Sequence, residues 1–163
     1  MANRILVLYG SYRTGRMGIR LANYLVKQLG ERGEETELID AKAVGLPILD
    51  RMYKEYTPGS APLALEALGA KIRAADAFVF VTGEYNWAMQ PGLKNLTDHF
   101  LEEWFWRPAA IASYSHSQAR FGVLQISSTD NDVFWFDYLI CFKRLWYKAV
   151  KFFFWLHHNL SIA

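Results

Sequence analysis

Gly10-Ser-Tyr-Arg-Thr-Gly-Arg-Met-Gly18 directly follows the apolar run Ile-Leu-Val-Leu-Tyr at residues 5–9. An apolar run without polar alternation is typical of a strand that is covered on both faces. Apolar residues then recur at helical spacing, which predicts a helix over residues 17–29. A buried strand, a glycine-rich turn and a helix in this order form the opening unit of a parallel α/β sheet.

The same alternation of strand and helix continues along the chain. Apolar runs predict strands at residues 37–39, 77–82 and 109–113, and helical spacing predicts helices at 61–75 and 91–104. We therefore expect an α/β protein built on a doubly wound parallel sheet. Ligands of such sheets bind outside the carboxyl ends of the strands, where the winding direction switches.

Residues 43–60 form an unusually long connection between the second predicted strand and the next helix. A connection of this length in a compact domain is usually functional or disordered. Its apolar content, with two tyrosines and several aliphatic residues, is too high for disorder. We expect a packed lid or a subunit contact, and a plain wandering connection is the alternative.

The composition excludes several classes of protein. The 163 residues predict a single domain with a real core, and a net charge of +2 does not favour nucleic acid as a partner. The single cysteine, Cys141, forms no intramolecular disulfide and builds no cysteine-based metal site. The apolar run near the N-terminus is too short for a signal peptide, so we expect a cytoplasmic protein. Charged residues interrupt the apolar stretch 133–156, which makes a membrane span unexpected.

The loop at residues 10–18 carries the groups that bind phosphate. Ser11 and Thr14 offer hydroxyls, Arg13 and Arg16 offer charge, and the following helix offers unpaired N–H groups. The alternative is an ordinary turn with its arginines in solvent. Arg-Met at residues 16–17 replaces the lysine and hydroxyl of a nucleoside triphosphate loop, and the dinucleotide glycine pattern is absent. A single phosphate fits this loop better.

The loop at residues 83–92 carries aromatic and amide groups that suit a planar ring. A capped helix start is the alternative interpretation. Asp40, after the second strand, is interpreted as a helix cap in preference to a ribose-binding acid. His99 is interpreted as a helix residue or polar contact. We predict no catalytic acid–base pair, nucleophile or metal site in this chain.

Four motifs together resemble the NADPH-dependent FMN reductase family. They are Leu-Tyr-Gly-Ser-x-Arg at 8–13, Gly-Glu-Tyr-Asn at 83–86, Pro-Gly-Leu-Lys-Asn-Leu-x-Asp-His-Phe at 91–100, and Ser-Tyr-Ser at 113–115. The family contains flavodoxin-like azoreductases, chromate reductases and quinone reductases. The resemblance covers about residues 3–116 and implies a flavodoxin-like sheet of strand order 2-1-3-4-5.

The resemblance also implies the cofactor and its site. FMN would be reduced by NADPH and would pass electrons to a quinone, an azo compound, a metal oxyanion or free flavin, often in a homodimer or homotetramer. The implied FMN-binding residues are Ser11, Arg13, Arg16, Met17 and Gly18 at the phosphate, Glu84, Tyr85, Asn86 and Trp87 at the isoalloxazine, and Tyr114, Ser115 and His116 at its pyrimidine edge.

Residues 117–163 depart from the family pattern, and aromatic residues concentrate there. Within one domain of 163 residues, we expect this C-terminal segment to be aberrant or divergent. A foreign or out-of-frame sequence, a divergent folded replacement and a basic helix on a membrane surface are the open alternatives. The functional alternatives are a non-enzymatic flavin-binding electron carrier and an inactive, truncated family member.

Overall fold

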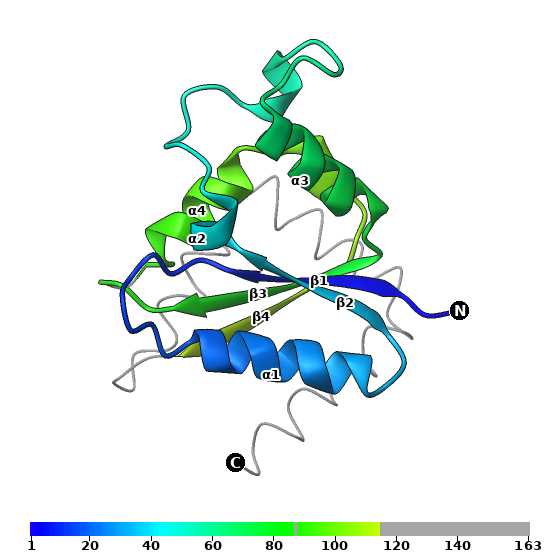
Figure 1. The fold of residues 1–163 in the computed structure, drawn as a ribbon, viewed down its shortest axis with the longest axis vertical. Helices are drawn as coiled ribbons and strands as arrows, with labels where there is room; N and C mark the ends of the chain where they lie inside the picture. The colour runs from blue at the N-terminus through cyan, green and yellow to red at the C-terminus, as the bar shows by residue number, and fades with distance from the viewer. Residues whose placement is uncertain (87, 115–163) are drawn as a thin grey trace.

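The computed structural model describes residues 1–86 and 88–114. Their four strands form one parallel sheet in the order β2-β1-β3-β4, where the strands are β1 (Arg4–Tyr9), β2 (Glu35–Asp40), β3 (Ala77–Gly83) and β4 (Ala109–Tyr114). Figure 1 shows β1 and β3 at the centre of this sheet. The order confirms the flavodoxin-like arrangement for these four strands. The fifth strand of the predicted order, and the whole segment 117–163, lie outside the described residues.

Helices cover both faces of the sheet (Figure 1). One face packs on α1 (Ile19–Gly30), and the other packs under α2 (Ala41–Val44), α3 (Leu63–Ala74) and α4 (Pro91–Asp98). Successive side chains of a strand point to opposite faces. Leu6 and Leu8 of β1 therefore enter the α3–α4 core, while Val7 and Tyr9 enter the α1 core. This two-sided burial explains why the β1 sequence is apolar without alternation.

The helix predicted over residues 91–104 is wrong beyond residue 98. α4 ends at Asp98, Leu101 leaves the helical region (φ −133°, ψ −74°), and a separate 3₁₀ turn, η2, spans Glu102–Trp104. The indole of Trp104 donates to the carbonyls of Thr97 and Phe100, both at 3.2 Å. Trp104 is fully buried, with its ring centroid 5.0 Å from that of Phe78. Tertiary packing of one large side chain therefore interrupts the helical periodicity.

The connection between α2 and α3 packs against α4. It contains a 3₁₀ turn, η1 (Tyr53–Glu55), whose first N–H donates to the His99 carbonyl at 2.7 Å. The Asn95 side chain accepts from Leu49 N–H at 2.9 Å and donates to the Pro47 carbonyl at 2.8 Å. His99 is buried and serves as a polar contact, with Nδ1 2.7 Å from the Asn95 carbonyl oxygen. The segment is thus packed, and its role as a lid or subunit contact stays a prediction.

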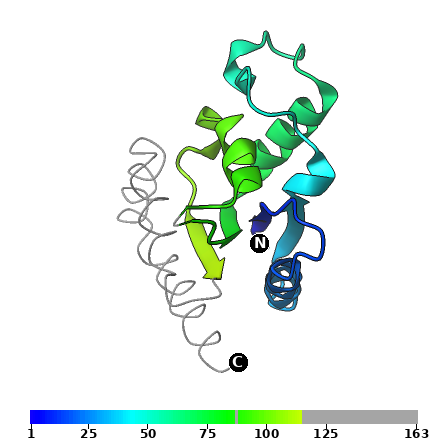
Figure 2. The ribbon, with the colours of Figure 1, turned by 90° about the vertical axis from the view of Figure 1, so that its left-hand side faces the viewer.

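The strand register brings the predicted site segments to one edge. Tyr9 lies opposite both Asp40 of β2 and Val81 of β3, and Gly83 lies opposite Tyr114 of β4. The loops that follow β1 and β3 therefore meet at the carboxyl edge of the sheet, the side that faces the viewer in Figure 2. Within the described ranges, no helix has the length and apolar character needed to cross a membrane.

Candidate functional site

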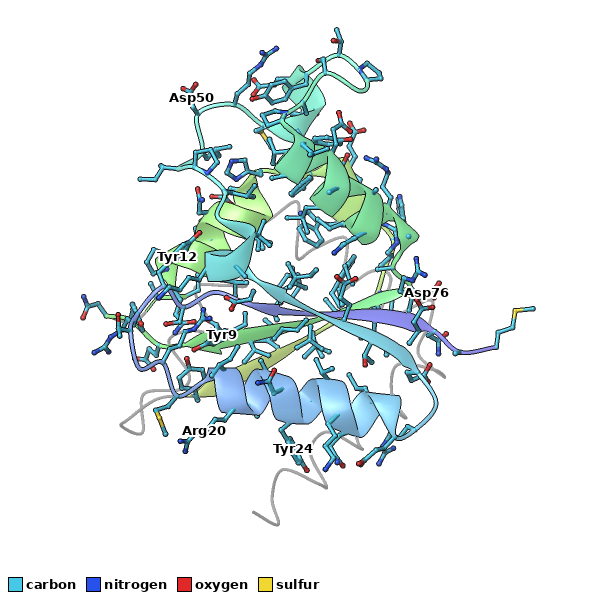
Figure 3. All side chains as sticks on the ribbon, viewed as in Figure 1. Tyr9, Tyr12, Arg20, Tyr24, Asp50 and Asp76 are labelled. Atoms are coloured by element: carbon cyan, nitrogen blue, oxygen red, sulfur yellow. The ribbon has the colours of Figure 1, made fainter. Side chains whose placement is uncertain are left out.

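The loop 10–18 and the start of α4 are in backbone contact. A Cβ atom added at Gly10 would overlap the backbone of Leu93, and one added at Gly92 would overlap the Gly10 carbonyl. The ring of Tyr12 also lies against Gly92, beside α2 and α4 in Figure 3. Only glycine permits so close an approach of two chain segments. These glycines therefore fix the distance between the first loop and α4.

Ser11 joins the first loop to the second. Its side chain is buried, and its Oγ lies 3.3 Å from the hydroxyl of Tyr85, which follows β3. The backbone N–H of Arg13 donates to the same Oγ at 3.4 Å. Two segments more than 70 residues apart in the chain thus share one part-buried contact between hydroxyl groups.

The two arginines of the first loop have different surroundings. Among the described residues, the exposed guanidinium of Arg13 has no hydrogen-bond or ion-pair partner. The Arg16 guanidinium pairs with both carboxylate oxygens of Asp40, and its Nη1 donates to the Ser11 carbonyl at 2.7 Å. The hydrogen bond that Arg16 donates to the Asp40 carboxylate raises the pKa of Arg16. The predicted phosphate contact of Arg16 would therefore compete with this pair.

The end of the first loop leads into α1 without a side-chain cap. Gly18 is the N-cap residue, and within the described part of the chain no side chain caps the first turn with a hydrogen bond. Met17 is exposed, while Gly18 is buried against the ring of Tyr114. Uncapped N–H groups and the positive end of the helix dipole form an anion site. The chain thus offers a phosphate the helix terminus together with the Arg13 guanidinium.

The second loop begins as a tight turn. Tyr85 and Ala88 exchange backbone hydrogen bonds of 2.9 and 3.0 Å, and Asn86 adopts a left-handed conformation with φ 50°. Asparagine tolerates this conformation better than most residues. The N–H of Glu84 donates to the Tyr114 carbonyl at 3.1 Å, which ties the turn to β4. Among the described residues, Oε2 of Glu84 is buried without a hydrogen-bond partner.

Tyr114 is the centre of a small polar network at the ends of β1, β3 and β4. Its hydroxyl accepts from Gln90 Nε2 at 2.9 Å and lies 3.2 Å from the hydroxyl of Tyr9. Its ring packs against Gly83 as well as Gly18. Burial is the main cause that raises the pKa of the Tyr114 phenol above its ordinary value.

Gln90 was not singled out from the sequence, although it lies at the same edge. It is the N-cap residue of α4, it is almost fully buried, and its Oε1 finds no partner within the described part of the chain. A buried polar atom without a partner costs free energy. The signal in the sequence that could have identified Gln90 is its position directly before Pro91-Gly92, where a helix begins. Tyr9 was likewise interpreted only as the last residue of a strand.

The arrangement suits a phosphorylated planar ligand. The unpartnered acceptor oxygens of Glu84 and Gln90 would be satisfied by N–H donors of a ring, and Arg13 with the α1 terminus would receive a phosphate. The described site residues thus gather at one edge. Trp87, Ser115 and His116 lie outside the described residues. Within residues 1–86 and 88–114, no three His, Cys, Asp or Glu side chains are grouped to hold a metal ion.

Comparison with known families matches most of the chain to one of them. A sequence model of the family described as NADPH-dependent FMN reductase matches residues 3–132. The match continues past residue 116, where the motifs led us to expect the resemblance to end.

Two relatives show the extent of the similarity. The chain is 37% identical over 123 residues to an NAD(P)H-dependent FMN reductase of Schizosaccharomyces pombe, covering 68% of this chain and 57% of that protein. It is 34% identical over 95 residues to a quinone reductase of Escherichia coli K12, covering 58% and 48%. The chain therefore spans only about half of the length of these two relatives.

Solved structures share the fold. A flavoenzyme NAD(P)H:acceptor oxidoreductase of Paracoccus denitrificans superimposes with a TM-score of 0.61 at 23% identity, over 79% of this chain and 70% of that one. An NAD(P)H:quinone oxidoreductase of Methanothermobacter marburgensis gives 0.59 at 18% identity, over 82% and 77%.

Proposed function

The chain belongs to the NADPH-dependent FMN reductase family, and we propose that it is an FMN-dependent oxidoreductase that carries electrons from NADPH to a small acceptor. The observation that carries the proposal is the meeting of two distant loops at the carboxyl edge of the sheet, through the contact between Ser11 and Tyr85. This edge is where doubly wound sheets bind their ligands. A quinone, an azo compound, a metal oxyanion or free flavin would be the acceptor.

The chain's own residues would bind and orient the cofactor. Arg13 and the start of α1 would hold the FMN phosphate, because the Arg13 guanidinium has no partner among the described residues and none of their side chains caps the helix. Glu84 and Gln90 have buried oxygens that could accept from ring N–H groups. The proposed set also includes Met17, Gly18, Asn86 and Tyr114, together with Trp87, Ser115 and His116 beyond the described residues.

The carboxyl edge of the sheet would align the rings of FMN and NADPH, and this alignment needs no proton-transfer group. Bound FMN would supply the redox chemistry, taking a hydride from NADPH and passing two electrons to the acceptor. Gly10 and Gly92 hold the two loops together, and Tyr114 packs between the ends of three strands. We assign no catalytic side chain, because alignment of two flat rings needs a firm surface and fixed polar contacts.

We also propose a homodimer or homotetramer in the cytoplasm. Two large apolar side chains, Ile48 and Leu63, are more than four-fifths exposed at either end of the packed connection. Exposed apolar side chains on one segment favour association with a second copy. The single cysteine is consistent with a reducing compartment. Light scattering of the purified chain would measure the assembly.

FMN binding and reduction by NADPH test the function. The purified full chain is titrated with FMN, and quenching of flavin fluorescence gives the dissociation constant. Anaerobic addition of NADPH should then bleach the flavin absorbance faster than it does with free FMN. Riboflavin, which lacks the phosphate, should bind more weakly.

The outcomes separate the alternatives. FMN that is bound but not reduced by NADPH would exclude the proposed reaction and favour an electron carrier. A chain that binds no FMN would favour an inactive family member.

A further inference from the structure

The guanidinium of Arg16 is engaged in hydrogen bonds to other groups of the protein. Nη1 donates to Asp40 Oδ1 and to the Ser11 carbonyl, both at 2.7 Å, and Nη2 pairs with Asp40 Oδ2. The side chains of Arg16 and Asp40 are only 19% and 13% exposed. The Arg16 guanidinium also lies 5.5 Å from the centre of the Tyr9 ring. The fork of donors that would recognise a phosphate is therefore already occupied by a carboxylate.

Asp40 is itself held in place by the fold. It is the last residue of β2, opposite Tyr9 in the register, and its carboxylate accepts from the Lys42 N–H at 3.1 Å to cap α2. Gly15, directly before Arg16, adopts the left-handed conformation with φ 67° that favours glycine. The Arg16 guanidinium thus ties the first loop to the adjacent strand β2 through Asp40. It also joins two parts of the loop, because it donates to the Ser11 carbonyl as well.

We propose that Arg16 is a positioning residue, which holds the phosphate-binding loop in shape through Asp40 and Ser11 and does not itself bind the FMN phosphate. The inference rests on the proposed FMN site. Arg13 is then the arginine that contacts the phosphate, because its guanidinium is exposed and has no partner among the described residues. The pairing with Arg16 also neutralises the Asp40 carboxylate, which would otherwise repel a phosphate at this edge.

Asp40→Asn gives opposite results under the two roles of Arg16. Asparagine keeps an oxygen that caps α2, since Asn and Asp are similar N-caps, but it loses the charge and the two-pronged pairing. If Arg16 positions the loop, FMN affinity falls about tenfold or more, the expected loss for one charged hydrogen bond. If Arg16 binds phosphate and Asp40 competes for it, the substitution frees Arg16, removes a repulsive charge and raises FMN affinity.

Arg16→Lys provides a second variant with the charge retained. Lysine is a point charge and does not reproduce the planar fork. We expect a loss of FMN affinity similar to that of Asp40→Asn, and we expect the double variant to lose no more than either single one. A lysine that preserves FMN affinity would show that only positive charge is needed, which would overturn the inference.

The ratio of riboflavin to FMN dissociation constants separates positioning of the phosphate loop from general destabilisation. The inference predicts that this ratio falls in Asp40→Asn and Arg16→Lys while riboflavin affinity is unchanged. Equal losses for both ligands would indicate a purely structural role and would overturn it. Asp50→Asn, at an exposed carboxylate in the packed connection (Figure 3), is the matched control and should leave both constants unchanged.

The wild-type titration distinguishes failure of this inference from failure of the function. If the wild-type chain binds no FMN, the proposed function fails and the inference falls with it. If the wild type binds FMN and Asp40→Asn binds it equally well or more tightly, the inference alone is wrong. Circular dichroism of each variant checks that it folds. If Asp40→Asn does not fold, Arg16→Lys is used for the test.

Discussion

The two ends of the β1–β2 strand pair each carry an arginine–carboxylate ion pair, but the two pairs differ in burial. At the amino end, Arg4 pairs with Glu35 at 2.7 Å, and their side chains are 44% and 61% exposed. At the carboxyl end, the side chains of Arg16 and Asp40 are 19% and 13% exposed. Exposed pairs add little stability, whereas a buried charge that loses its partner is costly. We therefore expect the less exposed pair, Arg16 with Asp40, to contribute more to stability than the pair at the amino end.

The comparison extends to the groups around each pair. At the amino end the polar groups form hydrogen bonds with one another. The Asp76 side chain accepts from the Arg4 N–H at 2.8 Å, and the Asp76 N–H donates to the Arg4 carbonyl at 2.7 Å. At the carboxyl end Glu84 and Gln90 keep buried oxygens without partners among the described residues. The sheet therefore has one end where polar groups pair with one another and one end where buried acceptor oxygens lack partners among the described residues.

The largest effect is expected from Gly10→Ala, which breaks the carboxyl end. The new Cβ would collide with the backbone at Leu93, which a rotamer change does not relieve. We expect a loss of about 3 kcal/mol in the free energy of unfolding, the upper end for overpacking, together with loss of FMN binding. Urea denaturation measures the first and fluorescence titration the second.

Gly30→Ala is the matched control for this prediction. Gly30 ends α1, and a Cβ there would lie 3.6 Å from the nearest neighbouring atom, Thr36 Oγ1. Stability should stay the same or rise by up to about 1 kcal/mol, because alanine favours helix. Equal losses for both variants would contradict the close approach at Gly10.

Arg13→Ala is expected to weaken FMN binding without affecting the fold. Loss of one charge-assisted contact corresponds to about 1.5 to 3 kcal/mol of binding free energy. The exposed position of Arg13 predicts little change in the urea midpoint. Arg32→Ala, at an exposed arginine just past the C-terminal end of α1, is the control. Unchanged FMN affinity in Arg13→Ala would remove this arginine from the phosphate site.

Tyr114→Phe should change how stability depends on pH. Burial raises the pKa of the Tyr114 phenol above its ordinary value of 10.0. At a pH below 10.0 the phenol is protonated in both the folded and the unfolded chain. As the pH rises above 10.0, the unfolded chain loses this proton first, because its phenol has the lower pKa. The free energy of unfolding of the wild type therefore falls as the pH rises. The variant should be less stable than the wild type near neutral pH by about 1 kcal/mol, from lost hydrogen bonds.

The difference in the free energy of unfolding between the wild type and Tyr114→Phe should therefore shrink above pH 10. Urea denaturation at pH 8 and at about pH 11, one unit above the ordinary phenol pKa, measures this change. Tyr24→Phe, at an exposed phenol on α1 (Figure 3), is the control. A constant difference between wild type and Tyr114→Phe across this range would contradict the burial argument.

Glu35→Gln should have the smallest effect, and it sharpens the contrast between the two ends. The Arg4–Glu35 pair is exposed, so water and salt screen it. We expect a smaller change in urea midpoint than for Gly10→Ala or Tyr114→Phe, no change in FMN affinity, and no effect of the substitution at high salt. An effect on FMN affinity as large as that of Asp40→Asn would show that the two ends do not differ as argued.

Local patterns were sufficient to predict the four strands and the helices α1, α3 and α4 in their order along the chain, but not α2 or the two 3₁₀ turns. The unbroken apolar runs of β1 and β3 and the helical spacing after Met17 predicted strands and a helix that the structure contains, with ends shifted by one or two residues. The interpretation of Asp40 as a helix cap was correct, because capping depends on neighbouring backbone groups. The helix over 91–104 was predicted too long because Trp104 packs into a core contributed by other elements.

The sequence by itself determined the α/β class, the turn chemistry after β1 and the location of the candidate site, because apolar periodicity and glycine conformation act over a few residues. Only the tertiary structure decided which groups of that site are engaged. The partner of Arg16 comes from β2, and the neighbour of Gly10 comes from α4. Strand order and register place these distant residues together, so contact and burial, and not residue type, separate Arg13 from Arg16.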